Sequence, residues 1–161
     1  MADFTTEISD ADLNRAIGTI TRRLDSNGLQ PVLQDLGEYL LDQVQTRFDT
    51  QTDPQGTPWA DISPAWKTEK ERRRGIPKIL QFRGDLRRSI VYQVQASQRR
   101  VVIGSNLPYA NIHQFGGEIQ RTGRRKGPYT IRIDARPYLG LNAADRQEII
   151  QIIRDHLAGI S

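Results

Sequence analysis

Apolar positions recur at helical spacing in the first third of the chain, which predicts two amphipathic helices. The first begins at a capping-type pair, Ser9 and Asp12, and ends at Asn27-Gly28. The second begins at Pro31, a residue suited to the first turn of a helix, and continues for about 18 residues. The apolar positions are Leu13, Ile17, Ile20 and Leu24 in the first helix and Leu33, Leu36, Leu40, Val44 and Phe48 in the second.

Turn-forming residues separate these helices from a short basic one. Residues 53–59 combine Pro and Gly with one large aromatic, Trp59, which we expect to be buried and to hold an ordered loop. Ser63-Pro64 predicts the start of a helix that runs to about Arg74 and stops at the Gly and Pro that follow. Because only one side of this helix can face a core, Trp66 should be at least partly exposed.

The middle of the chain alternates between apolar and polar residues, as strands do. Residues 90–96 place apolar side chains at every second position, and residues 99–104 are the predicted hairpin partner. Residues 129–133 alternate in the same way after residues 121–127, a basic, Gly-containing stretch that we expect to be a hairpin loop. Strands grouped between helical ends predict an α+β fold with an antiparallel sheet rather than parallel βαβ units.

Shorter signals complete the predicted architecture. A helical turn is expected at residues 85–89, and a short helix at residues 109–115, closed by Gly116 and Gly117. Asn142 can cap a last long helix. The antiparallel sheet should therefore be packed by two N-terminal helices and one C-terminal helix. A length of 161 residues fits a single domain, with a helical part at 1–48 and an α+β core at 49–161.

Composition narrows the function classes. The chain has no cysteine, so disulfides, thiolate zinc sites and thiol nucleophiles are excluded, and a reducing cytoplasm suits it. No apolar run reaches the roughly 20 residues that span a bilayer, and the first ten residues do not resemble a signal peptide. We expect no membrane contact. The net charge of +4 fits either acidic protein partners, the more common case, or nucleic acid.

No catalytic constellation is visible. The two histidines, His113 and His156, lie far apart, and a lone His such as His113 in a short helix is more often a packing residue than a base or ligand. The carboxylates are scattered beside turns and basic residues, without the pairing that acid–base catalysis needs. We therefore expect no enzyme, no metal and no cofactor. A hydrolase built on His113 and Asp85 is a weaker alternative.

Two basic clusters are the candidate interaction residues. They could bind phosphates or an acidic protein surface, or they could simply be solvated charges. The second cluster is the stronger candidate, because its cations are dense, lie among glycines and should project from the domain. The clusters consist of Arg72, Arg73 and Arg74, and of Arg121, Arg124, Arg125 and Lys126.

Several sequence blocks occur in an order that resembles the phage virion morphogenesis family, including the tail-completion proteins of Mu-like and related tailed phages. They are Trp59 with Ser63-Pro64, then residues 78–80 (KIL) and 84–90 (GDLRRSI), then residues 109–117 (YANIHQFGG) and 135–141 (ARPYLGL). The likeness covers the chain from about Phe48 onward. It implies a structural part of the head–tail junction or tail end, with no catalytic residue or cofactor.

The same blocks have physical interpretations. We expect Tyr109, Ile112 and Phe115 to anchor the short helix on the sheet, around the possible packing residue His113, while Gly116 and Gly117 turn the chain. Arg136 is held extended by Pro137 and should bind a carboxylate or carbonyl within the subunit or across an interface, with an internal salt bridge favoured.

These observations together predict a non-enzymatic ring subunit of the virion neck or tail, made in the host cytoplasm. It would cap or complete the tail and support head–tail joining. A hexamer is favoured because it matches a six-fold tail, and the first two helices are candidates for one interface. The expected partners are copies of itself, other phage neck and tail proteins, and DNA passing through the lumen. The alternative function is a nucleic-acid-binding module without sequence preference, using the two basic clusters.

Overall fold

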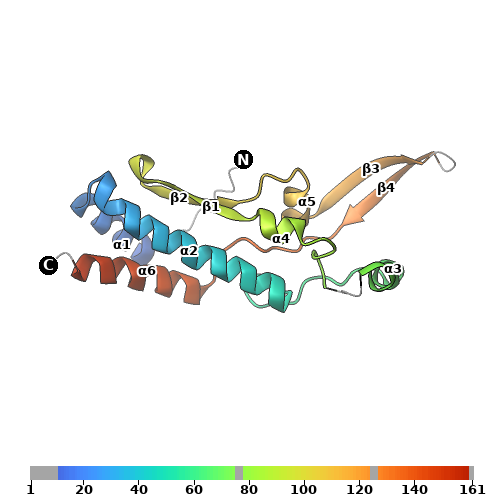
Figure 1. The fold of residues 1–161 in the computed structure, drawn as a ribbon, viewed down its shortest axis with the longest axis horizontal. Helices are drawn as coiled ribbons and strands as arrows, with labels where there is room; N and C mark the ends of the chain where they lie inside the picture. Colours follow the sequence, from blue (N-terminus) through green and yellow to red (C-terminus); the bar gives the residue numbers. More distant parts are fainter. Residues whose placement is uncertain (1–10, 75–77, 124–126, 160–161) are drawn as a thin grey trace.

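The computed structural model describes residues 11–74, 78–123 and 127–159. Long helices lie at one end of an elongated molecule, and a two-stranded ribbon projects from the other (Figure 1). The order of elements along the chain is α1 (Ala11–Arg23), α2 (Ser26–Thr50), α3 (Pro64–Arg74), α4 (Asp85–Ser89), β1 (Val91–Gln95), a 3-10 turn η1 (Ala96–Gln98), β2 (Arg100–Gly104), α5 (Ala110–Phe115), β3 (Gly117–Gly123), β4 (Gly127–Ile133) and α6 (Ala143–Ala158).

Both N-terminal helices are present, but the boundary between them differs from the prediction. Asn27-Gly28 does not end α1; it lies in the first turn of α2, where the Asp25 side chain accepts a hydrogen bond of 2.8 Å from the Gly28 backbone N–H. Pro31 therefore lies inside α2 and does not begin it. The Asp25 cap satisfies a backbone donor at the helix end, so the helix can start five residues before the proline.

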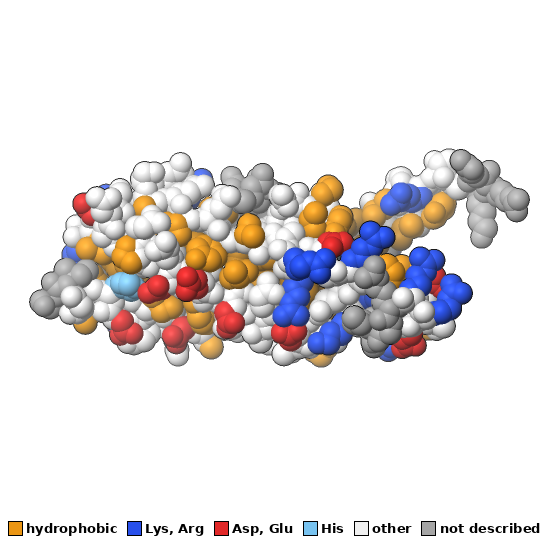
Figure 2. Space-filling view, in the orientation of Figure 1, with side chains coloured by type: hydrophobic (Ala, Val, Ile, Leu, Met, Phe, Trp, Pro, Cys, Tyr) orange, Lys and Arg blue, Asp and Glu red, His pale blue; other side chains and the backbone are white. Residues whose placement is uncertain are grey.

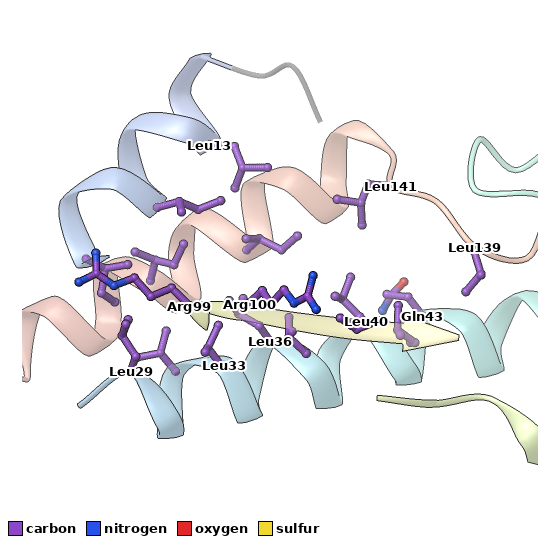
Figure 3. A pocket seen from close by; sticks show the side chains of 18 of the residues that line it. Leu13, Leu29, Leu33, Leu36, Leu40, Gln43, Arg99, Arg100, Leu139 and Leu141 are labelled. Carbon is purple, nitrogen blue, oxygen red and sulfur yellow. The ribbon is translucent and has the colours of Figure 1, made fainter. Parts of the chain in front are cut away.

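A first hydrophobic core joins the helices at one end. Leu13 of α1, Val32 of α2 and Ile153 of α6 are almost completely buried. An apolar pocket of about 380 Å³ lies among α1, α2, α6 and β2, lined mainly by Leu, Ile and Val side chains such as Leu29 and Leu36, with Arg99 and Arg100 at its edge (Figure 3). Its lining belongs largely to this core, so we assign it to packing.

The strands form two separate antiparallel hairpins. In the first, Val91 pairs with Gly104 and Gln95 with Arg100. The ring of Tyr92 lies so close to Gly37 of α2 that a β-carbon there would be 2.2 Å from it. The strand can therefore approach α2 because residue 37 has no side chain. The predicted α+β class is confirmed, with two small sheets.

The second hairpin replaces most of the predicted loop. Residues 117–123 form β3 and residues 127–133 form β4, paired from Gly117 with Ile133 to Gly123 with Gly127. Arg121 is therefore a strand residue opposite Tyr129 and does not belong to a loop. Side chains along β3 alternate between the two faces of the ribbon, as they do along β4.

The C-terminal helix begins as predicted. The Asn142 side chain accepts from the Asp145 backbone N–H at 2.8 Å, and the Asp145 carboxylate accepts from the Asn142 backbone N–H at 2.9 Å. This reciprocal capping box fixes the start of α6. Ile149 and Ile153 then face the first core.

Candidate interaction surface

A second hydrophobic core lies at the base of the projecting ribbon. The Phe48 ring meets Trp59 edge-on and packs against Tyr138, with ring centroids 5.4 Å apart in both pairs. Trp59 is 5% exposed and donates from its indole Nε1–H to the Pro137 carbonyl at 2.8 Å. The predicted burial of Trp59 and exposure of Trp66, which is 45% exposed, are confirmed.

Gln114 of α5 connects two of the sequence blocks. Its side-chain oxygen accepts from the backbone N–H groups of Tyr138 and Leu139, each at 3.0 Å, and its Nε2 donates to the Leu139 carbonyl at 3.0 Å. The Tyr138 hydroxyl donates a hydrogen bond to the Ala110 carbonyl at 3.0 Å. Residues 109–117 and 135–141 are therefore held together by buried hydrogen bonds, which fix where the ribbon leaves the body.

Gly116 is needed at the sharp turn between α5 and β3. Its φ of 73° lies in the left-handed region, and a β-carbon there would lie 2.8 Å from the Ala135 nitrogen and 2.9 Å from the Ile133 oxygen. A side chain at this position would be strained and would clash with backbone. The predicted turning role of Gly116 is confirmed.

The expected apolar anchoring of α5 is wrong in part. Tyr109 is 40% exposed and Phe115 is 65% exposed, whereas the buried side chains of this segment are Ala110 and Gln114. The helix is short, with six residues from Ala110 to Phe115, and it is fixed by hydrogen bonds more than by its large side chains.

Arg136 is internal, as expected, but it does not form the favoured salt bridge. It is 8% exposed, and its guanidinium donates to the backbone carbonyls of Ala60 at 2.7 Å and Asp61 at 3.0 Å. Backbone carbonyls can accept the hydrogen bonds of a planar guanidinium, so no second charge has to be buried. Arg136 therefore joins the loop after Trp59 to the strand end before Pro137.

His113 lies beside Arg136, and its ring is not fully satisfied. Burial, helped by the nearby Arg136 charge, lowers the pKa of His113. Its Nδ1 is buried and has no hydrogen-bond partner among the described residues. The predicted packing role agrees with this burial, although the ring nitrogen is left unpaired.

A buried ion pair joins α2 to α6 and was missed in the sequence. The Arg47 guanidinium contacts the Asp145 carboxylate at 2.8 Å and also donates to the carbonyls of Tyr138 at 3.0 Å and Gly140 at 2.8 Å. A signal was present, since Arg47 follows Val44 by three positions on the apolar stripe of α2. A cation at a core position indicates a buried partner.

The β3–β4 ribbon has one apolar face and one polar face. Ile119 lies opposite Ile131, and Arg121 lies opposite Tyr129, on one side of the ribbon. Tyr129 is 47% exposed and Ile131 is 36% exposed. An isolated two-stranded hairpin is only marginally stable in water. Its uncovered apolar face is therefore a candidate contact surface.

A groove of about 1010 Å³ runs between this face and α3. The ribbon contributes Ile119 and Ile131, and α3 contributes Trp66, whose ring lies 5.6 Å from that of Phe82. Lys70 of α3 is 2% exposed at the groove and donates from Nζ to the Lys78 carbonyl at 2.5 Å. Burial, together with the Arg136 charge, lowers the pKa of Lys70.

Only part of the two predicted basic clusters falls among the described side chains. Arg72 and Arg73 are exposed on α3, and both pair with Glu69 of the same helix. Arg74 is the last residue of α3. Arg121 lies on β3, and Arg124, Arg125 and Lys126 lie outside the described residues. Lys and Arg side chains nevertheless gather over α3, α4 and the ribbon in Figure 2.

The exposed apolar face of the ribbon and the groove beside it together form a candidate contact surface. Among the described residues no group of His, Asp and Glu could hold a metal ion. None of the helices in that part of the chain is both long and apolar enough to cross a bilayer.

The chain belongs to the phage virion morphogenesis family, whose model matches residues 8–158. The match extends the likeness expected from Phe48 onward into the N-terminal helices. Membership also confirms that the chain is a structural tail-completion-type protein and not an enzyme.

Three relatives support the assignment. Protein G of Escherichia phage Mu, named for capsid assembly, is 33% identical over 88% of this chain and 84% of its own length. Tail completion protein S of Escherichia phage P2 is 29% identical over 83% and 87%. Mu-like prophage FluMu G protein 2 of Haemophilus influenzae is 39% identical over 58% and 59%. Comparison with solved structures finds no match.

Proposed function

We propose that the chain is a ring subunit of the virion neck, which completes the tail and supports head–tail joining. Two relatives support this position, because one is named for capsid assembly and another for tail completion. A protein at the junction of head and tail would serve both processes. A ring of six copies is favoured, since it would match a six-fold tail tube.

The projecting ribbon is the observation that carries the proposal. Its apolar face is uncovered, while the long helices lie at the opposite end of the molecule (Figure 1). A contact between the two ends of neighbouring copies joins different patches, and such heterologous contacts form a ring when the rotation from copy to copy closes. The same end-to-end geometry would leave both faces of the ring open for other neck and tail proteins.

The oligomeric state tests the ring directly. Native mass spectrometry of the purified full chain, at several concentrations and in low salt, should show a closed species of six copies beside the monomer. Negative-stain images of that species should show a ring. A chain that remains monomeric at about 100 µM in low salt, where surface charges are least screened, contradicts the ring.

Particle assembly tests the place in the virion. A phage that lacks this gene should accumulate heads and tails that are not joined, and expression of the chain in the same cells should restore joined, infectious particles. Joined particles without the chain contradict the proposed function.

The basic cluster of Arg121, Arg124, Arg125 and Lys126 is proposed to contact an acidic partner or DNA in the lumen. Changing Arg121, Arg124, Arg125 and Lys126 to Ser should alter the free energy of unfolding by less than about 0.5 kcal/mol, because surface changes usually do so. The same variant should give fewer infectious particles in the complementation assay, since charges at a rim steer association. Normal yield would assign these cations to solvent.

A further inference from the structure

Charge is unevenly distributed between the two ends of the chain. Helix α2 contains four carboxylates, Asp35, Glu38, Asp42 and Asp49, and a single basic residue, the buried Arg47. On the face of the molecule seen in Figure 2, most Asp and Glu side chains lie over α2 and α6, whereas Lys and Arg lie over α3, α4 and the ribbon.

The acidic side chains of α2 form a stripe. Asp35, Glu38 and Asp42 are spaced by three and four residues, so they share one exposed face of the helix. Asp35 pairs with His156, and Glu38 accepts a long bond of 3.4 Å from the Tyr92 hydroxyl. Asp42 has no ion pair within the described part of the chain. The stripe is therefore only partly neutralised by its own subunit.

The groove beside the ribbon has the opposite charge at its rim. Arg83, Arg121 and Arg132 all line it and are exposed. None of the three forms an ion pair with another described residue. Arg121 shares the apolar face of the ribbon with Tyr129 and Ile131, both of which are exposed, whereas Arg132 lies opposite Glu118 on the other face. Three carboxylates also line the groove, Asp61, Asp85 and Asp134, of which Asp61 pairs with Lys67 and Asp85 with Arg88. They are outnumbered by the Lys and Arg residues of the lining, so the groove offers apolar area with an excess of positive charge.

We propose that this groove receives the acidic face of α2 from a second copy of the chain. The inference rests on the proposed ring and specifies which two surfaces meet in it. The arginines at the rim would face Asp35, Glu38 and Asp42 of the neighbour, and the ribbon would lie along the neighbour's helix. A helix with its side chains is about 10 Å across, a size that an open groove of about 1010 Å³ admits.

A second copy fits the groove better than a nucleic acid does. Phosphates would also be attracted by the three arginines, but they would leave the acidic stripe of α2 without a partner and would bring no apolar surface to Ile119 and Ile131. Pairing the two ends of the chain neutralises both charged surfaces at once and repeats from copy to copy.

Cysteine cross-linking tests the pairing, because the chain contains no cysteine. A variant carrying both Tyr129→Cys and Asp42→Cys should form, on mild oxidation, a ladder of covalent oligomers up to the full ring. Each single variant should form no ladder, because the contact joins different patches. A control that combines Tyr129→Cys with Arg22→Cys on α1 should also stay uncross-linked. A dimer from Tyr129→Cys alone, or no ladder from the pair, overturns the proposal.

Charge reversal supplies an independent test. Arg121→Glu/Arg132→Glu and Glu38→Lys/Asp42→Lys should each weaken self-association at least about tenfold, as expected for opposed charges at a contact. Mixed in equal amounts, the two variants should regain the ring, with alternating subunits. Arg22→Glu/Arg23→Glu on α1 is the matched control and should assemble normally.

The two hypotheses fail in different ways. A wild-type ring that both reversals leave intact contradicts this pairing and leaves the ring standing. A wild-type chain that forms no ring contradicts the proposed function itself. Fluorescence anisotropy with a labelled DNA duplex gives a third outcome: binding that Arg121→Glu/Arg132→Glu abolishes, together with unchanged oligomerisation, would assign the groove to nucleic acid and overturn the pairing.

Discussion

Replacing Gln114 by alanine tests the buried link between α5 and the segment that enters α6. The Gln114 side chain satisfies the backbone N–H groups of Tyr138 and Leu139 and the Leu139 carbonyl, each at 3.0 Å. A buried donor left without a partner costs about 1–3 kcal/mol. Because one water could bridge both N–H groups, we expect a loss of about 3 kcal/mol in the free energy of unfolding.

Urea unfolding followed by tryptophan fluorescence measures this loss, since Trp59 lies in the same core. For a chain of this size, about 3 kcal/mol corresponds to a fall in Tm of roughly 6–12 °C. Gln120→Ala is the matched control, because the Gln120 side chain accepts only one exposed hydrogen bond, from the Thr130 hydroxyl at 2.9 Å. Its effect should stay within about 0.5 kcal/mol. Equal effects of the two substitutions would refute the role given to Gln114.

Two further outcomes follow from particular contacts. Gly37→Ala should destabilise the fold by about 1–3 kcal/mol in the same assay, because its β-carbon would lie 2.2 Å from the Tyr92 ring, whereas Gly18→Ala, with no contact nearer than 3.5 Å, should be neutral or stabilising. The lowered pKa of His113 keeps its ring neutral in the fold, while the unfolded chain takes up a proton below about pH 6.5. Stability should therefore be complete above that pH and fall as pH decreases. His113→Phe should reduce the difference between the urea midpoints measured at about pH 7.5 and 5.5. An unchanged difference would show that His113 is not the source of this pH dependence.

Local patterns in the sequence predicted most elements of the fold. Helical spacing identified α1, α2 and α6, and alternation identified β1, β2 and β4, because each pattern follows from the geometry of one element. The predicted start of α2 at Pro31 was wrong, because the Asp25 cap allows the helix to begin at Ser26. The extension of β3 through Arg121 was missed because basic residues and glycines also occur in loops.

Long-range contacts were harder to predict. Arg136 was expected to bind a carboxylate or a carbonyl, with an internal salt bridge favoured, yet it donates to the carbonyls of Ala60 and Asp61, more than seventy positions away in the sequence. Nothing local in the sequence specifies which loop carbonyls will reach a buried guanidinium. Tyr109 and Phe115 were expected to anchor the short helix on the sheet, but both are exposed, and the Gln114 amide holds the helix by hydrogen bonds instead.

Several residues of the blocks that made the family recognisable form buried hydrogen bonds within the chain. Gln114, Gly116 and Tyr138 must satisfy fixed backbone groups of their own chain, so their identity reports the architecture that makes the ribbon project. The side chains of Arg83 and Arg132, in contrast, form no ion pair with another described residue, so in the proposed contact they contribute charge, which any nearby cation could supply. Recognising the blocks therefore predicts where the ribbon projects, while in the proposed contact the partner is selected by complementary charge.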